Sequence, residues 1–188
     1  MGVSGLSQCA PRTGRPLTQQ AISTILLNQK FTREALEAQV QQSDYPIVHL
    51  ATHGQFGSSA EDTFVVAWDQ TINAYQLNDL LRRSEQARQQ PIELLVLSAC
   101  QTAAGDQRAA LGLAGMSVQA GARSTLASLW QIDDESSAAL ISHFYQHLAE
   151  KGHTKAQALR QAQLDLISHP DFRHPAHWSA FVLVGNWL

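Results

Sequence analysis

Two residues of the sequence, Cys100 and His53, are of the types that carry out nucleophilic chemistry on a carbonyl group. A cysteine thiolate can attack the carbonyl carbon, and a histidine can protonate the departing amine near neutral pH. Negative charge develops on the carbonyl oxygen during the attack, and two backbone N–H groups would stabilise it. The natural donors are those of Gly54 and of Cys100 itself. This set of residues predicts cleavage of an acyl bond through a thioester.

Both side chains follow short apolar segments, which are typical of strands buried in a parallel sheet. Residues 46–51 precede His53, and residues 94–98 precede Cys100. Ligands of open α/β sheets bind at the carboxyl ends of the strands, so adjacent strands would bring both side chains to one edge. The histidine precedes the cysteine by 47 residues, close to the spacing of roughly 50 in caspases.

The remainder of the chain alternates between helix and strand patterns. The spacing of apolar residues predicts helices over 17–27, 32–42, 76–89, 108–121, 134–152 and 154–168, and strands over 63–68, 71–74, 124–129 and 181–184. This alternation predicts an α/β fold with a mostly parallel sheet and helices on both faces. We expect residues 1–17 to be a flexible segment or linker and residues 18–188 to form one domain.

The composition is that of a soluble globular protein. Of the 188 residues 44% are hydrophobic and 15% charged, and the net charge of −3 gives no basic footprint for nucleic acid. No apolar stretch approaches the roughly 20 residues of a membrane-spanning helix, so we expect no membrane partner. The two cysteines stand far apart, which argues against a disulfide framework and favours a cytoplasmic location.

A cysteine and a histidine in these positions can also have purely structural roles. A free cysteine is often simply buried, and a histidine at a strand end often bonds a loop. His49 and His53 have the spacing of a helical zinc motif, but Leu50 replaces its glutamate and the segment is predicted to be a strand. His49 is therefore interpreted as a buried strand histidine, and the prediction for metals is none.

Other histidines are given structural roles. No cysteine or carboxylate stands at ligand spacing from the group His143, His147 and His153, which is interpreted as solvated helix surface. The group His174, His177 and Trp178 is interpreted as packing and capping residues, because no further metal ligands accompany it.

Four residues could contact the substrate. Asp106 lies in the loop after Cys100, and Trp130, Asp133 and Asp134 follow the predicted strand 124–129. Their carboxylates could bind a basic side chain, and Trp130 could line a pocket. Capping of the following helix explains Asp133 and Asp134 equally well.

Several ordered motifs resemble a known family, the CHAT domains. These motifs are HLATHGQF (49–56), LVLSACQTAAGD (95–106), LGLAGMSVQAGARSTLASLWQIDDESS (111–137), ALRQAQ (158–163) and HPAHWSAFVLVGNWL (174–188). The resemblance covers about residues 24–188 and is strongest to the cyanobacterial branch of this mostly bacterial family. CHAT domains are caspase-like peptidase domains, often attached to tetratricopeptide repeats.

The resemblance implies a caspase-haemoglobinase-like three-layer sandwich and a cysteine endopeptidase. It implies catalytic roles for His53 and Cys100, an oxyanion role for Gly54, no metal and no cofactor. The implied partners are a protein or peptide substrate and a tetratricopeptide-repeat or other regulatory partner, which could activate the enzyme. Neither a nucleic acid nor a membrane is implied.

Two departures bear on substrate preference. Thr102 stands where the caspase signature has glycine, so a preference for aspartate is not carried over. Ser98 stands where metacaspases have an aspartate that helps to recognise basic side chains. Two alternatives remain: a catalytically silent CHAT module for interaction or signalling, and another cysteine-based acyl transferase or hydrolase.

Overall fold

A computed structural model describes residues 23–42, 45–55, 59–88, 91–99, 115, 118, 121–130 and 132–188. Its elements, in chain order, are η1 (Asn28–Lys30), α1 (Arg33–Gln42), β1 (Ile47–Thr52), β2 (Gly54–Gln55), β3 (Phe64–Val66), β4 (Thr71–Asn73), α2 (Ala74–Arg88), β5 (Leu94–Ala99), β6 (Ser124–Ser128), α4 (Asp134–Leu148), α5 (Lys155–Ser168), α6 (Pro175–Trp178) and β7 (Phe181–Gly185). The predicted helix 108–121 lies outside these ranges except for Gly115 and Val118, which are helical.

The main sheet has the strand order β1-β5-β6-β7. Strands β1, β5 and β6 are parallel, and β7 is antiparallel to β6. The carboxyl ends of the three parallel strands therefore lie at one edge of the sheet, which we call the carboxyl edge. The antiparallel strand β7 begins at this edge, where Phe181 is paired with Ser128.

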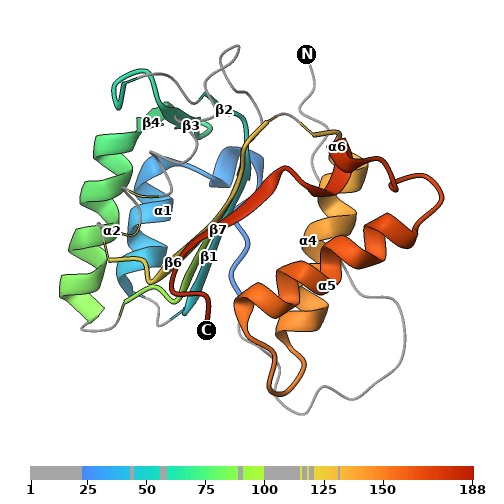
Figure 1. The fold of residues 1–188 in the computed structure, drawn as a ribbon. Coiled ribbons are helices and arrows are strands. Elements are labelled where there is room, and N and C mark those ends of the chain that lie inside the picture. The colour runs from blue at the N-terminus through green and yellow to red at the C-terminus, as the bar shows by residue number, and fades with distance from the viewer. Residues whose placement is uncertain are drawn as a thin grey trace.

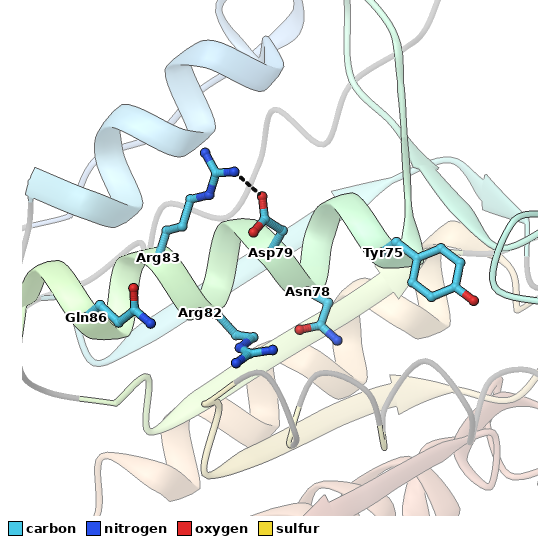
Figure 2. A pocket seen from close by; sticks show the side chains of 6 residues that line it. All are labelled: Tyr75, Asn78, Asp79, Arg82, Arg83 and Gln86. Carbon is cyan, nitrogen blue, oxygen red and sulfur yellow. Dashed lines mark ion pairs between the residues drawn. The ribbon is translucent and has the colours of Figure 1, made fainter.

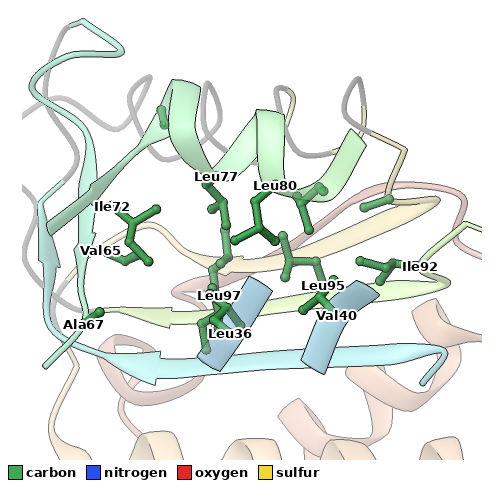
Figure 3. Packing of buried hydrophobic residues seen from close by; sticks show 14 of the residues in the cluster. Leu36, Val40, Val65, Ala67, Ile72, Leu77, Leu80, Ile92, Leu95 and Leu97 are labelled. Carbon is green, nitrogen blue, oxygen red and sulfur yellow. The ribbon is translucent and has the colours of Figure 1, made fainter. Parts of the chain in front are cut away.

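Strand β5 shows why helices cover both faces of this sheet. Alternate side chains of a strand point to opposite faces. Leu95 and Leu97 are fully buried and belong to a core with residues of α1 and α2, whereas Leu94 and Val96 belong to a second core with residues of α4 and α5. Figure 1 shows the two helical layers on either side of the sheet, and Figure 3 shows the first core. This arrangement is the predicted three-layer α/β sandwich with a mostly parallel sheet.

A second, smaller sheet has the order β2-β3-β4, with both pairings antiparallel. Strands β3 and β4 form the hairpin predicted within 63–74. The chain passes from the main sheet to the small one at His53, which separates the last residue of β1 from the first of β2. The short strand β2 was not predicted, because two residues carry no readable periodicity.

One local prediction is wrong, and a second holds in part. The helix predicted over 17–27 does not extend through 23–27, where the backbone is irregular. Ile25 and Leu27 are 71% and 55% exposed, so a helix there would have no apolar partner for its hydrophobic face. His49 is a strand histidine as predicted: part of its surface is open to solvent because β1 is the edge strand among those described, but its ring lies against Tyr145 and burial lowers its pKa to about 4.

Within the described ranges, no helix is both long and apolar enough to cross a lipid bilayer.

Candidate functional site at the carboxyl edge

His53 is exposed at the carboxyl edge, and its neighbours in the chain are held by β3. Its carbonyl oxygen accepts a hydrogen bond of 2.8 Å from the Val66 N–H. The Thr52 hydroxyl donates to the Val66 carbonyl oxygen over 2.6 Å. These two bonds tie the end of β1 to the small sheet. The backbone that carries the imidazole is therefore fixed by both sheets, which suits a group that must be positioned accurately.

The predicted nucleophile Cys100 and the predicted substrate residue Asp106 lie outside the described residues. Strand β5, which directly precedes Cys100 in the sequence, is described to its end. Its last residue, Ala99, is paired with Thr52, the last residue of β1. Neighbouring strands of a sheet lie about 4.8 Å apart. The register thus aligns the residues that immediately precede His53 and Cys100.

Gly54 is buried in β2, where it is paired with Val65. Residues of an antiparallel ladder alternate between hydrogen-bonded and non-hydrogen-bonded pairs. The bond from Val66 to His53 makes that pair the hydrogen-bonded one, so Gly54 and Val65 form a non-hydrogen-bonded pair. The Gly54 N–H therefore points away from β3. This direction leaves the predicted oxyanion donor outside the ladder.

Trp130, Asp133 and Asp134 follow β6 and therefore leave the sheet at the same edge as His53. Asp133 is the N-cap of α4: its carboxylate accepts 2.8 Å bonds from the Ser136 N–H and from His177 Nδ1, and a further bond from the Ser136 hydroxyl. Asp134 is exposed in the first turn of α4. The capping explanation for Asp133 is confirmed, and a role of these residues in binding substrate stays a prediction.

The contacts of Asp133 control its ionisation. Partial desolvation acts to raise the pKa of this carboxyl group, but the hydrogen bonds from Ser136 and His177 outweigh it and lower the pKa to about 2. Asp133 is therefore ionised throughout the physiological range. A carboxylate that is already bound by two residues has less capacity left for a substrate cation.

The short helix α6 packs beside the segment that follows β6 at the carboxyl edge. The indole Nε1 of Trp130 donates to the Ala176 carbonyl oxygen over 3.3 Å. His174 caps α6 by accepting from the Ala176 N–H, and Trp178 packs against the second core. The packing and capping roles predicted for His174, His177 and Trp178 are confirmed.

The interpretation of His143, His147 and His153 as solvated helix surface is wrong in one respect. The structure brings Asp165 of α5 against His143 and His147, and Glu150 against His147 and His153. The expectation of no carboxylate at ligand spacing is wrong, because Glu150 stands three residues from both His147 and His153, whereas Asp165 stands 18 residues beyond His147 and comes from another helix. The i, i+4 spacing of His143 and His147 was the available signal.

His49 and His53 cannot form the metal site that their spacing suggests, because β1 is a strand. Four residues of a strand span about 13 Å, which is too far for two ligands of one ion. The ring of His49 instead lies 5.8 Å from that of Tyr145 in α4.

A polar depression runs along the exposed face of α2 (Figure 2). The described residues that line it are Tyr75, Asn78, Asp79, Arg82, Arg83 and Gln86. Arg83 and Asp79 form an exposed ion pair of 2.7 Å, an arrangement that is typical of a solvated helix face. We assign it no part in the chemistry of the carboxyl edge.

Comparisons with known proteins agree with this arrangement. The sequence model of the CHAT domain matches residues 11–186. Tetratricopeptide repeat protein 28 from Homo sapiens is 32% identical over 100 residues, which are 52% of this chain and 4% of that protein. The chain is thus similar to a small part of a much longer protein whose name refers to its repeats.

Proposed function

Since the chain belongs to the CHAT domain family, whose members are caspase-like, we propose that it is a cysteine endopeptidase with His53 and Cys100 as its catalytic pair. The observation that supports this proposal best is the pairing of Thr52 with Ala99. Two parallel neighbouring strands end level with each other, and the next residue of each is the histidine or the cysteine.

The reaction follows from these residue types. The Cys100 sulfur attacks the carbonyl carbon of the scissile peptide bond, and the resulting tetrahedral intermediate collapses to a thioester. His53 carries the cysteine proton to the departing amine. Water then attacks the thioester, His53 accepts a proton from it, and the thiol is restored as the acid product leaves. His53 thus gains and loses one proton in each half of the reaction and ends in its starting state.

The developing oxyanion would be held by backbone donors. The Gly54 N–H points away from β3 and belongs to the residue after His53, so it is a suitable donor. We propose that the N–H of Cys100 is the second. Loss of one such donor typically costs a factor of 10² to 10³ in rate. Gly54 suits this position because a glycine lets substrate approach the backbone closely.

Trp130 and Asp134 are proposed to contact the substrate on the β6 side of the edge, with Asp106 from the loop after the cysteine. Asp134 suits a basic side chain better than Asp133, because Ser136 and His177 already bind the Asp133 carboxylate. A preference for lysine or arginine next to the cut would support this assignment.

Control by a partner is a further part of the proposal. The similarity to a tetratricopeptide repeat protein is compatible with a repeat module that acts on this domain. We propose that such a partner acts on the segments that follow His53 and Cys100 in the sequence, 54–62 and 101–108, and forms the substrate groove with them. Equal cleavage rates with and without candidate repeat partners would contradict this part alone.

The test is cleavage of a diverse peptide library, with the new termini mapped by mass spectrometry. His53→Ala and Cys100→Ala should each abolish cleavage. Matched controls are His49→Ala, a histidine on β1, the strand that precedes His53, and Cys9→Ala, the other cysteine. Both controls should retain activity.

Other outcomes favour the other candidates. With an added amine in the assay, a peptidase releases the amino-terminal fragment as a carboxylic acid. Release of this fragment as an amide of the added amine would identify an acyl transferase. No cleavage by the chain alone or with repeat partners would favour a catalytically silent interaction module.

A further inference from the structure

Three side chains from two helices converge on the face of the molecule formed by α4 and α5. His143 and His147 stand one helical turn apart on α4, and both reach the same carboxylate oxygen of Asp165 on α5. The Nδ1 atom of His143 lies 3.1 Å from Asp165 Oδ2, and the Nε2 atom of His147 lies 2.7 Å from it. All three side chains are partly exposed, so the cluster is accessible from solvent.

We propose that His143, His147 and Asp165 bind a zinc ion. Two imidazole nitrogens and a carboxylate oxygen form a donor set that zinc takes readily, with water in the fourth position. The ligand atoms of these side chains all lie within 4.8 Å of one another. Around a tetrahedral ion with bonds of about 2.0 to 2.1 Å, neighbouring ligand atoms are about 3.4 Å apart. The distances of 3.1 and 2.7 Å from Asp165 Oδ2 would have to lengthen by about 0.3 and 0.7 Å, a change that small rotations of these partly exposed side chains can supply.

A fourth residue, Glu150, prepares His147 for this role. Glu150 Oε1 lies 3.1 Å from His147 Nδ1, on the other side of the ring from Asp165. With its proton on Nδ1, the imidazole donates to Glu150 and presents the Nε2 lone pair to the ion. Zinc-bound histidines commonly have such a carboxylate partner, which orients the ring and increases its basicity. Glu150 is therefore a positioning residue of the proposed site.

The Asp165 carboxylate also affects how readily His147 is protonated. The hydrogen bond with Asp165 is the largest of several contacts that raise the pKa of His147. Zinc binds neutral imidazole, so binding should be measured at about pH 8, where most imidazoles are neutral.

The site is separate from the carboxyl edge. His143 stands ten residues after the N-cap Asp133, which corresponds to about 15 Å along α4. A zinc ion there would join α4 to α5 and stabilise their packing rather than take part in the reaction. This inference stands whether or not the chain is a peptidase.

The experiment measures zinc binding to the full chain at pH 8 after treatment with a chelator. Calorimetry is done with Cys9→Ala and Cys100→Ala combined, so that no thiolate contributes. We expect one zinc ion per chain. At zinc concentrations 100-fold above the dissociation constant, Tm should rise by about 5 to 10 °C. Cobalt in place of zinc should give the visible absorption of a tetrahedral complex.

Variants locate the ion. His143→Asn and Asp165→Asn should each weaken zinc binding at least tenfold, and Glu150→Gln should weaken it by about tenfold as a loss of orientation. The control is His153→Asn, because this histidine also contacts Glu150 but lies outside the proposed ligand set. The proposal is overturned if no zinc binds in the calorimeter. It is equally overturned if His153→Asn abolishes binding while His143→Asn and Asp165→Asn do not.

Discussion

Replacement of Asp133 separates its role as a helix cap from a role in binding substrate. Its carboxylate accepts hydrogen bonds from Ser136 and His177, and its pKa is lowered to about 2. An unscreened shift from 3.8 corresponds to about 2.5 kcal/mol of unfolding free energy. The side chain is 48% exposed, and solvent screening reduces this contribution to about 1 kcal/mol. We therefore expect Asp133→Ala, which also removes the cap, to cost about 1 to 2 kcal/mol.

Asp133→Asn is the matched variant, because asparagine is an equally good N-cap without the charge. The folded-state pKa of Asp133 lies below that of the unfolded chain, so its stabilisation is complete above about pH 4 and is lost as the pH falls toward 2. Urea unfolding at pH 7 and at pH 3 should show a smaller stability difference between wild type and Asp133→Asn at the lower pH. A difference that stays the same at both values would refute the assigned pKa.

The same variants address substrate binding. If capping is the whole role, Asp133→Asn leaves the KM for cleaved peptides unchanged, whereas Asp134→Asn raises it for peptides with a basic residue next to the cut. A large rise in KM in Asp133→Asn, without a loss of stability, would assign substrate contact to Asp133.

Two further substitutions test the packing. Phe144→Ala removes a side chain with 0% exposure from the second core and should cost about 3 to 5 kcal/mol in urea unfolding, whereas the exposed neighbour change Gln146→Ala should cost less than about 0.5 kcal/mol. Gly185→Ala should cost more than Gly152→Ala by calorimetry. Both glycines have positive φ angles, of 97° and 94°, but a Cβ at Gly185 would collide with the Arg123 carbonyl oxygen, while no described atom lies within 4 Å of one at Gly152. Equal losses would contradict the role of this backbone contact.

Regular elements with strong periodicity were predictable from the sequence. The helix after Thr154 begins with a capping box, in which Thr154 and Gln157 bond each other's backbone N–H groups, and the three-residue spacing of these two residue types marks the start of the predicted helix 154–168. In α4, Leu140 and Phe144 stand four residues apart, as the apolar spacing of the predicted helix 134–152 requires, and both are fully buried. In both helices the local sequence signals and the burial of apolar residues favour the same helix, and such agreement makes an element predictable from sequence.

Other features depend on contacts between distant segments. Residues 23–27 have helical composition but no core to cover, and β1 is less buried than its apolar sequence suggests because of its place at the edge. The cluster of His143 and His147 gains its carboxylate from α5, which packs beside α4 only once the chain has folded. Sequence spacing reports neighbours on one element and not those that packing brings from another.

The two sides of the carboxyl edge are held by separate sets of contacts. On one side, β3 fixes the backbone around His53 through Val66. On the other, α4, α5 and α6 hold one another: His177 bonds Asp133, and the Gln163 side chain of α5 donates to the Trp178 carbonyl oxygen over 3.3 Å. Distant substitutions without shared partners usually have additive effects. Thr52→Val and Asp133→Ala should thus lower stability by amounts that add in the double variant, and a coupling above about 0.5 kcal/mol would mean that the two sides move as one body.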